Sequence, residues 1–373
     1  MEQPIAPADA RSAPVDLAEP DPELLPLAAY TVFQIKQGEM LSVMLHLGER
    51  LGLFESMADG VARTSSEVAF AAGLQERWVR EWLYAVAAAG MVVHQRDGEL
   101  ERFSMSAEMS AVLGRPDHPS FSGRVFGAPV SRGTIDRLAD SFRTGVGFGW
   151  GDHGHDTAHM QASMSAGRQQ HFLVPVVLAS VDGLTERLEA GIRVVDAGCG
   201  SGVASCVMAE AFPHSIITGI DPSAPAIASA RQRAADLGLT NVSFEEQTFD
   251  DLEPGSVDFL LTLDVLHDIP RPADAVAAAR RAIADDGAWL VADIKASPTF
   301  EENRRNPMTG LFYSMSVVYC MNSALSEPDG AGLGTLGLHP ERLRGLVEGA
   351  GFSSFTFREF DEDVSNRYFE IRP

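Results

Sequence analysis

The sequence predicts an α/β protein in which a parallel sheet with a ligand-binding edge follows a mainly helical N-terminal part. In the second half of the chain, a buried strand, a glycine-rich turn, a helix, a second strand and an acid follow one another within residues 192–221. In the first half, the order helix, turn, helix and hairpin over residues 64–105 is typical of a winged helix. A length of 373 residues is more than one ordinary core accommodates and agrees with two domains.

Charge and cysteine content exclude several classes of protein. Asp and Glu total 52 against 29 Lys and Arg, so the formal net charge is -23, which argues against nucleic acid as a main partner. The cysteines Cys199, Cys206 and Cys320 form no CxxC pair, and this pattern indicates a reducing, cytoplasmic environment. We find neither a signal-peptide pattern nor a long uninterrupted apolar segment, so we expect no association with a membrane.

The first 120 residues predict a tail and a helical domain. Residues 1–22 are rich in Ala, Pro and Asp, and we expect a disordered tail because they cannot bury enough apolar surface to become ordered. Residues 23–120 should form the winged-helix domain. Its first helix should run from Glu23 to about Met57, because apolar side chains recur at three- and four-residue spacing. These are Met40, Val43, Met44, Leu47, Leu51 and Phe54.

Caps and turns predict the remaining elements of this domain. Thr64 to Glu67 should cap a short helix, which ends at Gly73. A longer helix should end at Gly90, with one apolar face formed by Trp78, Val79, Trp82, Leu83 and Val86. The turn at residues 96–99 contains Asp-Gly and predicts a hairpin. The longer helix carries few basic residues, so we expect this domain to serve packing and dimerisation and not DNA reading.

Residues 121–190 predict a helical linker that covers the ligand-binding edge. Residues 145–151 combine four glycines with Phe148 and Trp150, which is typical of a flexible aromatic loop. His155 and His159 would share a helix face, a spacing that can bind metal. No third strong ligand follows at a recognisable spacing, so we expect no metal site and a loop that covers a pocket.

The glycine-rich turn favours one class of ligand. Dinucleotide binders place a third glycine where this chain has Val203, because the helix N-terminus there meets a pyrophosphate. Asp196, just before the turn, suits a ligand with a positive end and no phosphate. Asp221, at the end of the second strand, can accept both hydroxyls of a ribose. S-adenosylmethionine (SAM) has these properties, whereas a nicotinamide dinucleotide does not. The glycines expected to leave room for the ligand are Gly198, Gly200 and Gly202.

Val194 to Gly202 resembles motif I of the class I SAM-dependent methyltransferases, and the resemblance extends over roughly residues 190–373. It implies a Rossmann-like, seven-stranded sheet in a domain at residues 191–373, mostly parallel with an antiparallel last strand. It implies the third strand and its following turn at residues 244–251 and the fourth strand at 257–263. It implies a helix end and the fifth strand at 282–293, with Asp285-Asp286-Gly287 as the turn. The sixth strand should follow Phe352 and the seventh should lie at 368–372. The implied cofactor-binding residues are Asp196, Gly198, Gly200, Gly202, Asp221, Pro222, Phe249, Asp250 and Asp264.

Leu266-His267-Asp268 resembles the His-Asp pair of plant-type O-methyltransferases, in which that His is the general base. An unperturbed imidazole has a pKa near 6.5, which suits removal of a proton from a hydroxyl acceptor. A capping or packing role for His267 remains an alternative, and Asp268 could orient the ring or cap the turn before Pro270. The candidate substrate-pocket residues are Trp150, Met160, Phe312, Met315 and Tyr319, which favours a small, largely apolar acceptor.

The N-terminal part resembles the winged-helix dimerisation domain of small-molecule O-methyltransferases and implies a homodimer. Methyl transfer to nitrogen or carbon remains open, because it needs only alignment and desolvation. A SAM-binding regulator that reads DNA through the winged helix is the alternative from another class.

Overall fold

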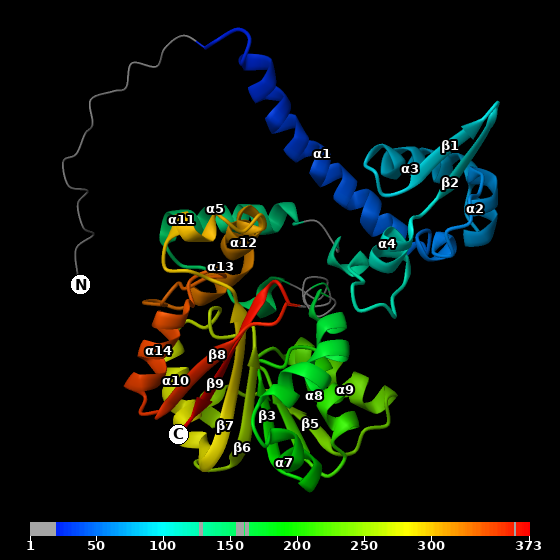
Figure 1. The fold of residues 1–373 in the computed structure, drawn as a ribbon. Helices are drawn as coiled ribbons and strands as arrows, with labels where there is room; N and C mark the ends of the chain where they lie inside the picture. The colour runs from blue at the N-terminus through cyan, green and yellow to red at the C-terminus, as the bar shows by residue number, and fades with distance from the viewer. Residues whose placement is uncertain (1–19, 127–129, 154–159, 161–163, 362) are drawn as a thin grey trace.

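The structure is a computed structural model that describes residues 20–126, 130–153, 160, 164–361 and 363–373. It has two parts: a helical part with a small hairpin, and a sheet with helices on both faces (Figure 1). The long helix α1 extends away from the sheet toward the hairpin part (Figure 1). The expected N-terminal tail lies almost entirely outside the described residues.

The N-terminal part has the predicted winged-helix order. Thr64 caps α2 with its side chain, and Glu67 returns a bond to the Thr64 backbone, so the predicted cap is confirmed. Gly98 begins the hairpin turn with a φ of +61°. The elements are α1 (Leu25–Arg50), η1 (Glu55–Met57), α2 (Ser65–Ala72), α3 (Glu76–Ala88), β1 (Val93–Asp97), β2 (Leu100–Ser104), α4 (Ala107–Met109), η2 (Ser110–Gly114) and η3 (Gly123–Phe126).

One face of α3 makes the core of this part, with a single correction to the prediction. Val79, Trp82, Leu83 and Val86 are buried as expected. Trp78 is 80% exposed, because it lies beside the apolar stripe of α3 and not within it. The first helix is shorter than predicted, since α1 ends at residue 50 and a separate short turn follows.

The C-terminal part is built on seven strands in the order β5-β4-β3-β6-β7-β9-β8. Every neighbouring pair from β5 to β7 is parallel, and β9 runs antiparallel to both β7 and β8, as the resemblance implied. The order reverses between β3 and β6, which creates a crevice at their carboxyl ends. The strands are β3 (Arg193–Ala197), β4 (Ile216–Ile220), β5 (Val242–Glu245), β6 (Val257–Leu263), β7 (Ile283–Ile294), β8 (Ser354–Arg358) and β9 (Asn366–Arg372).

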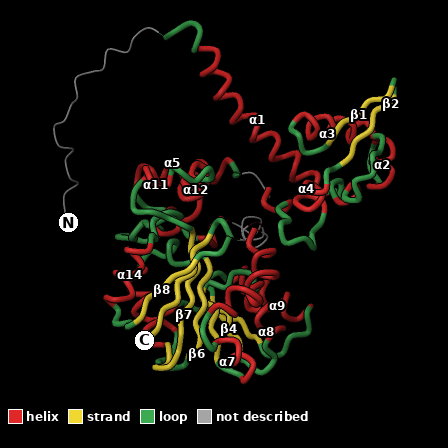
Figure 2. The backbone as a smooth tube through the Cα atoms, viewed as in Figure 1, coloured by secondary structure: helices red, strands yellow, loops and turns green. Residues whose placement is uncertain are grey.

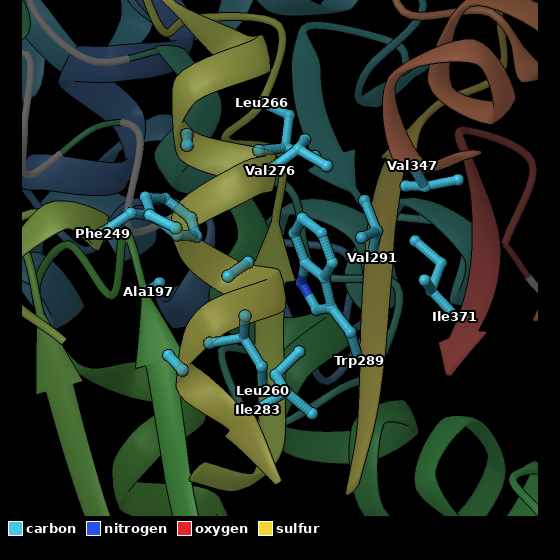
Figure 3. Close-up of a cluster of buried hydrophobic side chains, with 14 of the residues drawn as sticks. Ala197, Phe249, Leu260, Leu266, Val276, Ile283, Trp289, Val291, Val347 and Ile371 are labelled. Atoms are coloured by element: carbon cyan, nitrogen blue, oxygen red, sulfur yellow. The ribbon is translucent and has the colours of Figure 1, made fainter. Parts of the chain in front are cut away.

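Alternating side chains bury both faces of this sheet. Val195 of β3 faces the cluster under α10 and α14, whereas Val194 faces the cluster under α7 and α8. Figure 2 shows these helices on the two sides of the strands. Figure 3 shows the indole of Trp289 among aliphatic side chains of the first cluster, and its Nε1 donates to Thr262 Oγ1 over 3.2 Å. The helices and the turn after β5 are α7 (Leu184–Ala190), α8 (Val203–Ala211), α9 (Ala224–Asp236), η7 (Phe249–Asp251), α10 (Pro272–Ala282) and α14 (Pro340–Gly349).

The predicted turn at Asp285-Asp286-Gly287 is wrong. These residues lie inside β7, which begins at Ile283. The register of β6 against β7 shifts between Val257 and Phe259, so a bulge absorbs the turn-forming residues within the strand.

A layer of short helices covers one end of the sheet. α5, α11, α12 and α13 lie together beyond that end (Figure 1). The residues of this layer come from two stretches of chain, one before β3 and one after β7. They are α5 (Arg132–Thr144), η4 (Trp150–His153), the helical residues 164–168, α11 (Phe300–Asn303), α12 (Thr309–Met315), η8 (Ser316–Cys320) and α13 (Met321–Ala324). η5 (Gln169–Val177) and η6 (Leu178–Ser180) follow residue 168 and pack on the face of the sheet that carries α7 and α8. Among the described residues, we find no helix with the length and apolar content needed to cross a bilayer.

Candidate active site

The glycine-rich turn lies at the crevice between β3 and β6, and its three glycines serve different purposes. A Cβ at Gly198 would lie 2.5 Å from Val265 Cγ2, and one at Gly202 would lie 2.7 Å from the Phe244 ring. Both glycines are therefore required by the packing of the protein itself, and the expectation that they also leave room for a ligand stays a prediction. Gly200 has a φ of +52° and open space where its Cβ would be. Of the three glycines, Gly200 has the open space that a ligand needs in order to approach the backbone closely.

Two acids flank this turn, of which Asp196 is buried and Asp221 is partly buried. Asp221, directly after β4, accepts hydrogen bonds from the backbone N–H of Gly200 (3.0 Å) and of Ser223 (2.8 Å). Each carboxylate oxygen has a second acceptor position, so the ribose hydroxyls can still be bound. Asp196 lies within β3 and accepts from Ser205 Oγ over 2.6 Å. Burial raises the pKa of Asp196 to about 6, which is the environment expected where a cationic group is to be bound.

The residues predicted near the adenine lie on the turn after β5. Phe249 is buried and packs against the cluster that contains Trp289, with ring centroids 6.4 Å apart. Asp250 is exposed and lies 3.6 Å from Arg281. Pro222 is exposed beside Asp221. Their roles toward the adenosyl group stay predictions.

Asp264, at the end of β6, is held by side chains that the sequence did not identify. Arg168 Nη2 lies 2.9 Å from Asp264 Oδ2, and Asn366 Nδ2 donates to Oδ1. The backbone of Asp264 has a φ of +59°, which L-residues rarely adopt. Both carboxylate oxygens of Asp264 are therefore engaged, and its backbone N–H donates to the Ala292 carbonyl over 2.9 Å.

His267 is buried between two carboxylates. Its Nδ1 bonds Asp293 Oδ1 over 2.7 Å, and its Nε2 lies 3.1 Å from Asp268 Oδ1. Burial alone would lower the pKa of His267, but Asp293 and Asp268 raise it well above its ordinary value. The ring is therefore fixed in orientation, and its Nε2 does not face open space.

An aromatic cover closes over this cluster. Trp150 Nε1 donates to Asp268 Oδ2 over 2.7 Å, and the Trp150 ring stacks on Tyr319 with centroids 5.7 Å apart. His153 packs against Trp150 and Phe148, and burial lowers its pKa to about 4. The structure thus brings Trp150 and Tyr319 together, and their role in a substrate pocket stays a prediction.

The remaining predicted pocket residues are Phe312, Met315 and Met160. Phe312 lies in a separate cavity of about 290 Å³, together with Lys295, Leu336 and Arg367. Met315 and Met160 are half-buried. His155 and His159 lie outside the described residues.

Sequence reasoning missed Arg168, Asp293, Cys320 and Asn366. Asp293 had a signal, because it is an acid near the end of the buried run that follows Gly287 in β7. Arg168, Cys320 and Asn366 had none, since only the three-dimensional arrangement brings them to residues far away in the chain.

Two known protein families match separate parts of the chain. Residues 188–324 match a family described as a methyltransferase domain, and residues 39–115 match the Rv2258c-like winged HTH domain. A ubiquinone biosynthesis O-methyltransferase of Burkholderia multivorans (strain ATCC 17616 / 249) is 31% identical over 180 residues, 48% of this chain and 70% of that protein. The corresponding protein of Paracidovorax citrulli (strain AAC00-1) is 30% identical over 126 residues, 33% of this chain and 51% of that protein. The chain spans about half the length of several such curated relatives.

One solved structure aligns with almost the whole of this chain. Human N-acetylserotonin methyltransferase in complex with SAM aligns with a TM-score of 0.63 and 18% identity, over 95% of this chain and 99% of that chain. The fold and the matched families together define a Rossmann-like protein that uses SAM. The chain belongs to the class I SAM-dependent methyltransferases, and its N-terminal part is a winged-helix domain.

Proposed function

We propose that this protein transfers the methyl group of SAM to a hydroxyl oxygen of a small, largely apolar molecule. One observation carries the proposal: Gly200 and Asp221 lie on one side of the crevice, and His267 lies at the end of β6 on the other. When bound, SAM supplies a methyl group already activated by the sulfonium. The chain's own residues then need to align the acceptor and exclude water.

The adenosyl side of the proposal rests on the two acids. Asp221 would accept the ribose hydroxyls, and the open backbone at Gly200 would let the ligand lie against the turn. Asp196 would stabilise the positive end of the ligand. Phe249 and Asp250 would flank the adenine, and the backbone of Asp264 would face the amino-acid end.

On the acceptor side, His267 is the candidate base. Asp293 holds Nδ1, so the ring is oriented as in a carboxylate–histidine pair whose second nitrogen takes the proton. Asp268 lies beside that second nitrogen and is held by Trp150. Proton removal at Nε2 therefore requires Trp150 and Asp268 to move aside when the acceptor enters. A packing role for His267 is the alternative, and transfer to nitrogen or carbon would need no base at all.

The apolar character of the acceptor is inferred from the cover. Trp150 and Tyr319 present stacked rings, and Met315 lies on the same helical stretch as Tyr319. Flat apolar side chains bind flat apolar molecules through buried area and ring contacts.

We also propose a homodimer through the N-terminal part. Residues 24–40, from the N-cap of α1 into its second half, expose eight large apolar side chains, an area that a monomer in water rarely leaves uncovered. They are Leu24, Leu25, Leu27, Tyr30, Val32, Phe33, Ile35 and Met40. A second copy of the same helix would cover them.

A DNA-reading regulator has weaker support. The cations of α3 are already paired within the helix, because Arg77 lies 2.5 Å from Glu81 and Arg80 lies 3.3 Å from Glu76. Paired cations gain little from phosphate contacts.

The test combines binding and turnover. Calorimetry with SAM should give one site per chain, and methyl-labelled SAM should transfer its label to at least one phenol in a panel of phenols, aromatic amines and enols. Asp221→Asn should weaken SAM binding by about 2 kcal/mol, roughly 30-fold. Asp258→Asn is the matched control, since Asp258 pairs with Arg193 at the opposite end of the strands. Absence of SAM binding by the wild type would refute the proposal.

A further inference from the structure

His267, Asp268 and Cys320 bring nitrogen, oxygen and sulfur ligand atoms to one place. One such atom from each residue lies within 4.8 Å of the other two. His267 and Cys320 are buried, and the Asp268 side chain is only 13% exposed. Cys320 comes from η8, after β7, whereas the other two follow β6. Two separate stretches of chain therefore converge on this point.

The surrounding side chains fix which atoms face this point. Asp293 holds Nδ1 of His267, which leaves Nε2 toward Asp268. Trp150 donates to Asp268 Oδ2, which leaves Oδ1. A carboxylate on the far nitrogen of a histidine is the arrangement that orients metal-bound imidazoles.

The contact between the two nearest ligand atoms is not a normal hydrogen bond. His267 Nε2 and Asp268 Oδ1 are 3.1 Å apart, yet Oδ1 is buried and accepts no hydrogen bond from any described residue. Two ligand atoms that lie this close without a hydrogen bond between them are expected when both are directed at one bound ion. Ligand atoms about 2.0–2.2 Å from a tetrahedral ion are themselves separated by about 3.3–3.6 Å, slightly more than the distance between these two atoms.

We propose that His267, Asp268 and Cys320 bind one divalent transition-metal cation. The mixed nitrogen, oxygen and sulfur donors select Zn²⁺ over Mg²⁺ or Ca²⁺, which prefer oxygen. Three protein ligands leave a fourth position of a tetrahedral ion for a small molecule.

The charges around the site favour a cation. Asp268 and Asp293 both contact His267, and Asp264 is also near. Arg168 is already paired with Asp264 and Asp363. Two buried carboxylates around a single imidazole carry an excess of negative charge, which a bound cation would neutralise.

The site has a consequence for the proposed methyl transfer. A cation on Nε2 occupies the lone pair that a general base requires, so one molecule cannot use His267 in both ways. The cation site itself does not depend on the proposed function, and only this consequence rests on it.

The experiment uses Co²⁺ as the probe, added to chelator-treated full-length protein. Thiolate coordination gives a charge-transfer band in the near ultraviolet, and tetrahedral geometry gives intense visible bands. We expect both bands to saturate at one Co²⁺ per chain, and Zn²⁺ to displace them.

Variants identify the ligands. Cys320→Ser should lose the near-ultraviolet band, whereas Cys206→Ser should keep it, because Cys206 is buried in a different cluster with Phe244. Asp268→Asn should weaken Co²⁺ binding at least tenfold and keep the thiolate band at saturation, which tests the site even if Cys320→Ser fails to fold. Thermal unfolding monitors the fold of each variant.

The outcomes are distinct. Absence of a thiolate band in the wild type, or equal loss of it in Cys206→Ser, would overturn the cation site. SAM calorimetry on the same sample separates the two proposals, since SAM binding without the cobalt band leaves the methyltransferase proposal intact.

Discussion

Arg168 and Asp264 form an ion pair 96 residues apart in the chain, with 2.9 Å between Nη2 and Oδ2. The pair joins the helical residues before β3 to the end of β6. Arg168 also donates to Asn366 and lies 3.6 Å from Asp363, so one guanidinium connects the cover to β6 and β9. Asp264 keeps its left-handed backbone because its carboxylate is fixed in this way.

Arg168→Met should destabilise the protein by about 3–5 kcal/mol, because it leaves Asp264 and Asp363 without their cation in a buried site. Arg187→Met is the matched control. Arg187 lies 3.6 Å from Asp286, which is 85% exposed, and such pairs contribute less than about 1 kcal/mol. Urea unfolding followed by circular dichroism measures both. Similar midpoints for the two variants would contradict a structural role for the buried pair.

Gly200→Ala should weaken SAM binding strongly while the protein stays folded. The new methyl meets no protein atom, so it occupies only the space in which the ligand would lie. Gly255→Ala controls for backbone strain, since Gly255 has a φ of +65° and equally open surroundings on a turn before β6. Each substitution should cost about 1–2 kcal/mol of stability. Calorimetry should show a loss of affinity in Gly200→Ala alone, and equal affinities would mean that the ligand binds elsewhere.

SAM affinity should fall as the pH drops through the window around pH 6. Burial raises the pKa of Asp196 to about 6 and also raises that of Asp221, so both tend to take up protons on the acid side. A ligand with a positive end binds the ionised form of Asp196 better, and each pH unit below its pKa should cost about tenfold in affinity. Asp196→Asn should bind more weakly at neutral pH and show a flatter profile. If the SAM affinity of the wild type does not depend on pH, Asp196 does not interact with the positive end of the ligand.

Replacement of Phe33 and Ile35 by Glu should convert a dimer into a monomer. Phe33 is 71% and Ile35 is 74% exposed on α1, so the charges cost nothing within one chain but would be buried in an interface. Thr31→Glu together with Gln34→Glu adds the same charge on the same exposed helix and serves as the comparison. Sedimentation velocity reports the mass. A wild type that is monomeric at tens of micromolar would refute the proposed dimer.

Local patterns in the sequence predicted the strands around the site well. β6 occupies residues 257–263 as expected, and β3 and β4 flank the predicted glycine turn. Apolar runs bounded by Gly or Asp fix such short parallel strands, because each is buried on both faces. The capping box at Thr64 was equally local.

The sequence did not predict features that depend on contacts between segments far apart in the chain. Trp78 is exposed because the partner surfaces of α3 cover only a narrow stripe. Asp285 to Gly287 entered β7 because pairing with β6 outweighed their turn preference. Arg168 and Cys320 could not be assigned to the site from spacing, since tertiary contacts alone bring them to residues 264–268.

The path of the chain between β7 and β8 has an evolutionary consequence. The chain leaves the sheet after β7, forms α11 to α14, and then returns in β8 and β9, which complete the sheet. α14 packs on a face of the sheet, so the residues from α11 to α13 form an excursion from it. Phe312, Tyr319 and Cys320 all belong to this excursion. Its sequence can diverge while Asp196, Gly200 and Asp221 remain on strands and turns outside it. Changes within this excursion therefore alter the proposed acceptor side and leave the residues proposed to bind SAM in place.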